Sequence, residues 1–209
     1  MEKPCVFCDR SQLEERLIAE TRTLYFVATL GQITDGGYTI IIPKRHVSCV
    51  GAMEEREVEE VEAAMVQTSD AIEMEYGVRP VIFEHGIVGQ TIQHAHLHLM
   101  PAQIRLDNKI HLDFPETKIN VVSSLEVLRR LYEEGKKYLL YNMPAVPQLY
   151  FPAGIFHVAW NPPAPPQYLR TVSAELMGRP KRANWRNMDP ELDRQLWSET
   201  VQRLKKYYS

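Results

Sequence analysis

Three histidines alternate along the segment Gln93–Met100, at positions 94, 96 and 98. Successive side chains of a β-strand point to opposite faces, so a strand here places all three imidazoles on one face. The residues between and after the histidines are apolar and would share the other face: Ala95, Leu97 and Leu99. Imidazole is a nucleophile or metal ligand whose protonation changes near neutral pH. The segment therefore predicts a functional site on a strand.

The chemistry that suits such a strand is attack on phosphorus. A neutral imidazole can form a phosphohistidine that water later hydrolyses, which divides one difficult displacement into two easier ones. The second ring nitrogen must be held as a donor, and the transferred phosphoryl oxygens need donors of their own. We predict His96 as the nucleophile. The donors would be Gln90, Thr91, His98 and backbone N–H groups of the turn Gly86–Gln90.

Near the start of the chain, Cys5 and Cys8 form a CxxC pair. Such a pair can be redox-active, metal-binding or incidental. Thioredoxin-like chemistry requires a preceding strand, which the first eight residues do not offer. A zinc site requires two further nitrogen or sulfur ligands in a tetrahedral arrangement. Cys49 fits no ligand spacing and is expected to be a small buried hydrophobe.

The residues before the histidine segment predict a hairpin, a long helix and a strand. Strands are expected at Thr23–Thr29 and Tyr38–Ile42, around a glycine-rich turn. A helix is expected over Glu54–Tyr76, with Gly77 as its stop, because apolar residues recur there at spacings of three and four. Pro80–Glu84 is expected to be another strand, followed directly by the glycine turn and the histidines.

The second half of the chain predicts a mixed set of elements. A helix should begin at Ser123 or Ser124 and run to about Lys137. The remaining expected elements are short strands at Tyr138–Tyr141, Gln148–Phe151 and Phe156–Trp160, a proline-rich linker at Asn161–Pro166, and helices at Gln167–Met177 and Pro190–Tyr207. The chain has 209 residues, so we expect one large domain with an extension: residues 1–103 as a catalytic core and residues 104–209 packed on it.

The run from Gly86 to Pro101 resembles the signature of the histidine triad (HIT) superfamily of nucleotide hydrolases and transferases. Ile41–Val47 resembles the second conserved block of that family, and Phe7 with Cys5 and Cys8 resembles the start of its zinc-containing bacterial branch. The resemblance covers roughly residues 3 to 103. It implies an α+β, HIT-like fold in which a long helix packs on an antiparallel sheet, and it implies a homodimer.

The resemblance also implies roles for single residues. His96 would attack an α-phosphate to form a nucleotidyl-histidine, while Gln90 and His98 bind phosphate and help the leaving group. The predicted substrate contacts are Gly89, Thr91, His85 and Phe26. A structural zinc ion would be held by Cys5, Cys8, His46 and His94.

The implied function is hydrolysis at the α-phosphate of a dinucleoside polyphosphate or a nucleoside phosphoramidate. Two alternatives stay open. One is a nucleotidyltransferase with a phosphate or a small metabolite as acceptor, and the other is a non-catalytic nucleotide-binding protein.

The chain departs from the family pattern where phosphate or ribose would lie. His85 stands where Asn or Asp is common, the following turn is about one residue shorter, and Ala102 and Gln103 replace the usual basic residue after the proline. His85 is either a substrate contact or accessory acid, or a turn residue facing solvent. In the second half, Arg170 and Arg186 could reach a phosphate or lie on helix surfaces. Trp160 and Trp185 could stack on a base or belong to the core.

Composition narrows the partners. The net charge of −3 argues against binding to bulk nucleic acid. No run of about eighteen apolar residues predicts a membrane span, and the first residues lack the apolar core of a secretory signal. Three cysteines in a chain of this size do not make a disulfide framework. We therefore expect a cytoplasmic protein whose partner is a small nucleotide.

Overall fold

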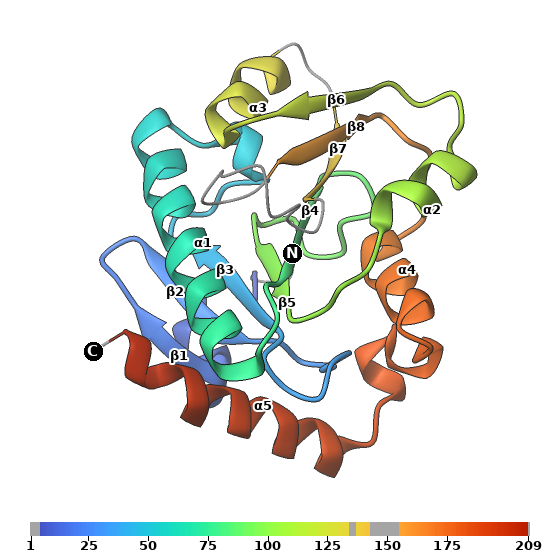
Figure 1. Ribbon diagram of the computed structural model, residues 1–209. Coiled ribbons are helices and arrows are strands. Elements are labelled where there is room, and N and C mark those ends of the chain that lie inside the picture. The colour runs from blue at the N-terminus through green and yellow to red at the C-terminus, as the bar shows by residue number, and fades with distance from the viewer. Residues whose placement is uncertain (1–4, 134–136, 143–154, 209) are drawn as a thin grey trace.

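The computed structural model describes residues 5–133, 137–142 and 155–208 of the chain (Figure 1). Its helices are α1 (Glu55–Tyr76), α2 (Leu106–Asp113), α3 (Leu125–Tyr132), α4 (Tyr168–Leu176) and α5 (Pro190–Leu204). Its strands are β1 (Leu17–Glu20), β2 (Leu24–Ala28), β3 (Thr39–Pro43), β4 (Val81–Gly86), β5 (Leu97–Met100), β6 (Ile119–Val122), β7 (Tyr138–Asn142) and β8 (Phe156–Trp160). The strands pair antiparallel in one sheet of order β1-β2-β3-β5-β4-β7-β8-β6, which confirms the predicted α+β class.

In the part of the chain that is described, no helix has the length and apolarity needed to cross a membrane.

The two halves of the chain share this sheet. Strand β7 of the second half pairs with the last four residues of β4 in the first half, from Phe83 opposite Tyr141 to Gly86 opposite Tyr138. Strands β8 and β6 then extend the sheet outward. The second half therefore continues the fold of the first half through backbone hydrogen bonds.

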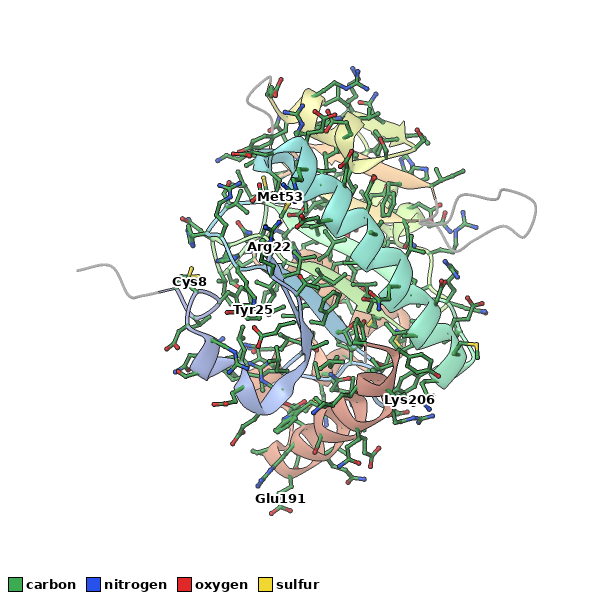
Figure 2. All side chains as sticks on the ribbon, turned by 90° about the vertical axis from the view of Figure 1, so that its left-hand side faces the viewer. Cys8, Arg22, Tyr25, Met53, Glu191 and Lys206 are labelled. Atoms are coloured by element: carbon green, nitrogen blue, oxygen red, sulfur yellow. The ribbon has the colours of Figure 1, made fainter. Side chains whose placement is uncertain are left out.

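Helix α1 crosses one face of the sheet, and α5 lies below it (Figures 1 and 2). The buried side of α1, including Val58, Val61 and Met65, joins the largest apolar cluster together with residues of the sheet. A capping box formed by Glu54 and Glu57 begins the helix, and the left-handed Gly77 (φ 70°) ends it. The long helix predicted from the spacing of apolar residues is confirmed.

The opposite face of the sheet has two separate covers. Helices α2 and α4 pack over the β4–β7 side, where Phe83 and Tyr141 are buried. The N-terminal segment packs over β2 and β3 through Phe7 and Leu13. His98 lies between the two covers, because residues directly opposite in an antiparallel pair share a face. Across the strands, the residues in register are Val27, Ile40, His98, Phe83 and Tyr141.

The histidine strand is shorter than predicted. Strand β5 begins at Leu97, and His94 and His96 precede it in irregular backbone, where Ala95 donates to the carbonyl of Val47. The predicted division of faces nevertheless holds, because Ala95, Leu97 and Leu99 pack in one apolar cluster while the imidazoles lie on the other side.

Other differences concern short elements. Strand β1 was not predicted, because only Ile18 of its four residues is buried and its pairing with β2 contains a register irregularity. Helix α2 and strand β6 were not predicted, because their short sequences show no clear apolar periodicity. Helix α3 is capped by Ser124 as expected but ends at Tyr132, and α5 ends at Leu204 with a short 3₁₀ turn after it. The predicted strand Gln148–Phe151 lies outside the described residues.

A carboxyl group is buried under the sheet on the α1 side. Glu84 is fully buried on β4, and it accepts hydrogen bonds from the Val50 N–H at 2.8 Å and the Tyr138 hydroxyl at 2.7 Å. The hydroxyl of Tyr138 in turn accepts from the Gly51 N–H at 2.9 Å. Glu84 thus joins the segment after β3 to strands of both halves. Burial raises the pKa of Glu84 from 4.5 to about 7.

Replacement of this group should change how stability depends on pH. Below about pH 4.5 the Glu84 carboxyl is neutral in both folded and unfolded chains. Between about pH 4.5 and 7 only the unfolded chain ionises it, so stability falls over this window and then levels off, by an amount on the order of 3 kcal/mol. We expect Glu84→Gln to lose this pH-dependent part of the unfolding free energy. The measurement is urea denaturation of wild type and variant at pH 4.5 and at pH 8, and the difference between the two proteins should change with pH. An equal difference at the two pH values would contradict the assignment.

Candidate functional site

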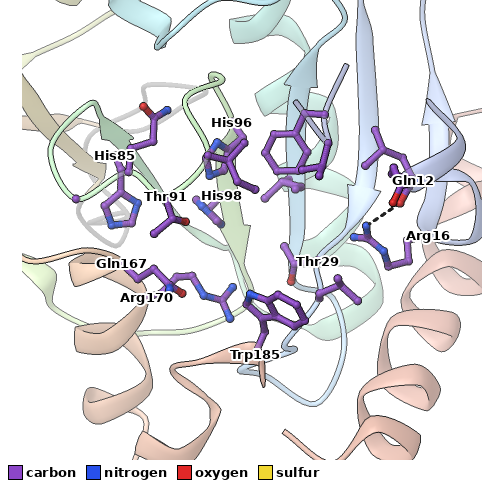
Figure 3. A pocket seen from close by; sticks show the side chains of 18 residues that line it. Gln12, Arg16, Thr29, His85, Thr91, His96, His98, Gln167, Arg170 and Trp185 are labelled. Carbon is purple, nitrogen blue, oxygen red and sulfur yellow. Dashed lines mark hydrogen bonds between the residues drawn. The ribbon is translucent and has the colours of Figure 1, made fainter. Parts of the chain in front are cut away.

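A cavity of about 320 Å³ opens between the two covers of the sheet (Figure 3). Its walls come from three parts of the chain: the N-terminal segment, the segment that carries the glycine turn and the histidines, and the second half. His96 and His98 lie on one wall, Gln12 and Arg16 on the side opposite, and Arg170 and Trp185 below (Figure 3). This volume is in the range of pockets that hold small ligands.

His96 has one ring nitrogen fixed and the other left for chemistry. Its Nδ1 lies 2.7 Å from the carbonyl oxygen of His94, and because a carbonyl can only accept, Nδ1 carries the proton. The lone pair of a neutral His96 is then on Nε2. Burial lowers the pKa of His96 to about 4, so the ring is neutral at pH 7. The side chain meets the predicted requirements of a nucleophile.

His98 lies beside His96, with 4.9 Å between the ring centroids. Its ring stacks on Phe83 at 4.6 Å, and its Nδ1 lies 2.9 Å from the hydroxyl of Tyr38. Burial raises the pKa of Tyr38 to about 12, so the hydroxyl keeps its proton and can donate it to Nδ1. The proton of a neutral His98 is then on Nε2, where it can be donated to a ligand oxygen.

Gln90 lines the cavity, but its amide nitrogen is already engaged. Nε2 donates to the carbonyl of Ser48 at 2.8 Å and to the carbonyl of His94 at 3.2 Å. The same His94 carbonyl accepts from His96. In this arrangement Gln90 holds the same backbone carbonyl that accepts from His96. Gly89 and Thr91 also line the cavity, and the carbonyl of Gly89 accepts from the Gln167 N–H at 2.8 Å.

His85 lines the cavity and is almost completely buried, so it does not face solvent. Its Nε2 accepts from the backbone N–H of Leu169 at 3.1 Å, which ties β4 to the first turn of α4. Burial lowers the pKa of His85 to about 3. A neutral ring at pH 7 that accepts through Nε2 suits a link between the two halves and does not suit an accessory acid.

Four predicted ligands come together at the edge of this site. The ligand atoms of Cys5, Cys8, His46 and His94 all lie within 4.8 Å of one another. The Nδ1 of His94 lies 3.4 Å from Cys5 Sγ and 3.5 Å from Cys8 Sγ, and the Nδ1 of His46 lies 3.3 Å from Cys8 Sγ. Sulfur and nitrogen ligands of one tetrahedral zinc ion are about 3.5 Å apart, so the set fits such an ion.

His94 is oriented for this role. Its Nε2 donates to the carbonyl of Pro43 at 2.7 Å, which leaves the lone pair on Nδ1 facing the thiols. Phe7, between the two cysteines, packs edge-on against His94 at 5.8 Å and against His96 at 5.1 Å. The cysteine turn therefore lies directly beside His96.

Of the arginines and tryptophans singled out in the second half, two line the cavity and two do not. Arg170 and Trp185 line the cavity. Arg186 is exposed and stacks on Trp185, with its guanidinium carbon 4.4 Å from the ring centroid, and it does not line the cavity. Trp160 is buried on β8 against Tyr138, so it belongs to the core.

Phe26 and Arg16 differ from the sequence prediction. Phe26 faces the α1 side of the sheet, away from His98, and packs against Tyr208 at 4.7 Å. We therefore do not include it among the substrate contacts. Arg16 was not predicted and lines the cavity. It follows a polar stretch without apolar periodicity, and no motif marked it.

The first half of the chain is similar in sequence to known proteins. Residues 12–104 match the family model described as HIT domain. An uncharacterised HIT-like protein of Mycoplasma genitalium is 28% identical over 102 residues, which are 46% of this chain and 72% of that protein.

Solved structures are also similar. A HIT family protein from Bacillus anthracis is 24% identical, covers 48% of this chain and 74% of its own, and has a TM-score of 0.44. A Zn-bound histidine triad family protein from Mycobacterium smegmatis is 23% identical, covers 51% of this chain and 78% of its own, and has a TM-score of 0.43.

Removal of the His85 ring should destabilise the junction between the halves. His85→Ala leaves the Leu169 N–H without its acceptor, and we expect it to lower the unfolding free energy by about 2 kcal/mol or more. His85→Gln, whose amide oxygen can accept in place of Nε2, should retain more stability. Urea denaturation measures both, with His111→Ala, a change at an exposed helix position, as the control. Equal stability of His85→Ala and wild type would refute the link.

Proposed function

This chain carries a HIT domain over residues 12–104 and belongs through it to the histidine triad superfamily, and from that premise we propose that it hydrolyses a nucleotide at its α-phosphate. The substrate would be a dinucleoside polyphosphate or a nucleoside phosphoramidate. One observation carries the proposal: His96 lines the cavity as a neutral ring whose Nδ1 proton is held by the His94 carbonyl. Residues beyond 104 are an extension that completes the cavity wall.

The reaction would proceed in two displacements. The Nε2 lone pair of His96 attacks the α-phosphorus, and the bond from phosphorus to the leaving group breaks, with its electron pair going to the leaving atom. Water then attacks the phosphorus of the nucleotidyl-histidine and loses a proton to solvent. The phosphorus–nitrogen bond breaks, and its electron pair returns to Nε2. A neutral His96 is required for the first step, which the low pKa of this ring favours.

His98 and Gln90 would support these steps differently. His98 donates from Nε2 to a phosphoryl oxygen, where negative charge develops, and the Tyr38 hydroxyl fixes this tautomer. Gln90 is a positioning residue, because its amide holds the His94 carbonyl that fixes His96. Gly89 and Thr91 would contact the phosphates from the glycine turn. The homodimer and the cytoplasmic location stay predictions from the sequence.

We further propose that Cys5, Cys8, His46 and His94 hold a structural zinc ion. Three sulfur–nitrogen distances of 3.3, 3.4 and 3.5 Å among these two thiols and two imidazoles support zinc, which prefers such a set of ligands. When bound, the ion would crosslink the N-terminal turn to the segment of the nucleophile and would take no part in the displacements. The His94 ring would thereby be fixed from both of its nitrogens.

Metal analysis tests the zinc proposal. The purified wild type should contain about one equivalent of zinc per chain, and the variant Cys5→Ser/Cys8→Ser should lose it. Cys49→Ser is the matched control, because Cys49 is buried away from the cluster and should leave the zinc content unchanged. Equal zinc in the wild type and the double variant would remove the proposal.

Trapping of the intermediate tests the reaction. The protein is mixed with an α-labelled dinucleoside polyphosphate or nucleoside phosphoramidate and quenched, and the label is located by peptide mapping. Wild type should carry label on His96. His96→Ala should carry none and should lose turnover by at least about a thousandfold, as expected when a nucleophile is removed.

The control is His111→Ala, an exposed histidine outside the cavity, which should label and turn over as wild type does. Wild-type turnover by His96→Ala would refute the mechanism. Label that is released only when a phosphate or metabolite acceptor is added would assign the transferase reaction in place of hydrolysis.

A further inference from the structure

The cavity carries positive charge without acidic residues. Among the described residues that line it, Arg16 and Arg170 contribute guanidinium groups and none is an aspartate or glutamate. Burial lowers the pKa of His85 and His98, so these two histidines of the wall are neutral at pH 7. A concave site with this charge favours an anion with more than one negative charge.

Arg170 is a buried cation, with only 7% of the residue exposed. Its Nη2 donates to the Gly31 carbonyl at 2.9 Å and its Nε to the Ala183 carbonyl at 3.4 Å. No carboxylate of a described residue forms an ion pair with it, and the acceptors of these two hydrogen bonds are neutral backbone carbonyls. A buried charge is costly unless it is paired, so this guanidinium is suited to an anionic ligand.

Arg170 is connected through Tyr38 to His98 and His96. Its guanidinium carbon lies 5.2 Å from the ring centroid of Tyr38, and the Tyr38 hydroxyl bonds to His98, which is next to His96. The charge of Arg170 also contributes to the lowered pKa of His98, after the larger effect of burial. A phosphate held by His96 and His98 would thus have Arg170 on its far side.

The loop below Arg170 holds the guanidinium in place. The N–H groups of Gly31 and Gln32 donate to Asp193 of α5 at 3.0 Å. Gly31 has a φ of +70°, and a Cβ there would lie 2.8 Å from Arg170 Nη2 and 2.5 Å from Trp185 Cβ. This close approach requires glycine, and it fixes the guanidinium before a ligand arrives.

We propose that Arg170 binds the phosphate next to the α-phosphate, on the leaving-group side, and so selects substrates with at least two consecutive phosphates. This inference rests on the proposed function, because it takes His96 to face the α-phosphate. When the bond from the α-phosphorus to the leaving oxygen breaks, that oxygen gains the electron pair, and Arg170 would stabilise the added charge on the leaving phosphate. Substrates that leave as a neutral amine would not use it.

Equilibrium binding tests this assignment without turnover. Full-length chains with His96→Asn are titrated with AMP, ADP and inorganic pyrophosphate by calorimetry. With Arg170 present, ADP should bind at least about tenfold tighter than AMP, as expected for a charge-assisted hydrogen bond to a second phosphate. Arg170→Gln should reduce this ratio to below about two and weaken pyrophosphate by a similar factor. Arg170→Lys, which keeps the charge, should retain part of the ratio.

Arg186→Gln is the matched control, because Arg186 is an exposed neighbour outside the cavity, and it should keep the full ratio. An unchanged ratio in Arg170→Gln, or an equal loss for AMP and ADP, would overturn the proposal and make Arg170 a structural residue. The pyrophosphate titration does not depend on a nucleoside or on His96. Absence of labelled His96 together with a lost pyrophosphate site in Arg170→Gln would therefore reject the proposed function and keep the anion site.

Discussion

The hydrogen bond from His96 Nδ1 to the carbonyl oxygen of His94 is the constraint on which the site depends. A carbonyl cannot donate, so this 2.7 Å contact fixes the tautomer of His96 without any charged partner. The ring of His94 points to the cysteines while its carbonyl points to His96. One residue thus joins the proposed metal centre to His96, and any change that moves the His94 backbone would alter both.

The second half of the chain positions the opposite wall of the cavity. Its strand β7 extends the sheet beside β4, and its helix α4 is tied to His85, so its residues reach the cavity from a fixed base. The Asp193 carboxylate of α5 holds the loop at Gly31, and Gly31 in turn accepts from Arg170. The Gln32 amide on the same loop donates to the Tyr38 carbonyl at 2.7 Å, and Tyr38 bonds to His98. Both halves therefore contribute to one rigid wall.

Local pattern was sufficient for the long helix, the central strands and the shared face of the histidines, because periodicity and alternate spacing are local properties. It was insufficient for β1, which depends on pairing with β2. It also did not predict where β5 begins, because Ala95 donates to the carbonyl of Val47 outside the strand pairing. It also placed Phe26 in the site although Phe26 faces the opposite core. The positions of the Gln90 and Arg16 side chains could not be predicted from local pattern either. The carbonyls that accept from them belong to Ser48 and Ala28, which lie in other segments of the chain.

The central claim is that the α-phosphorus passes through a covalent bond to His96, and the stereochemistry at phosphorus tests it most directly. Each in-line displacement inverts the configuration, so two displacements restore it. A dinucleoside polyphosphate with a chiral α-phosphorothioate is hydrolysed in ¹⁸O-labelled water, and the configuration of the product is determined. The account predicts net retention. Inversion would mean that water attacks phosphorus directly, and it would contradict the role assigned to His96.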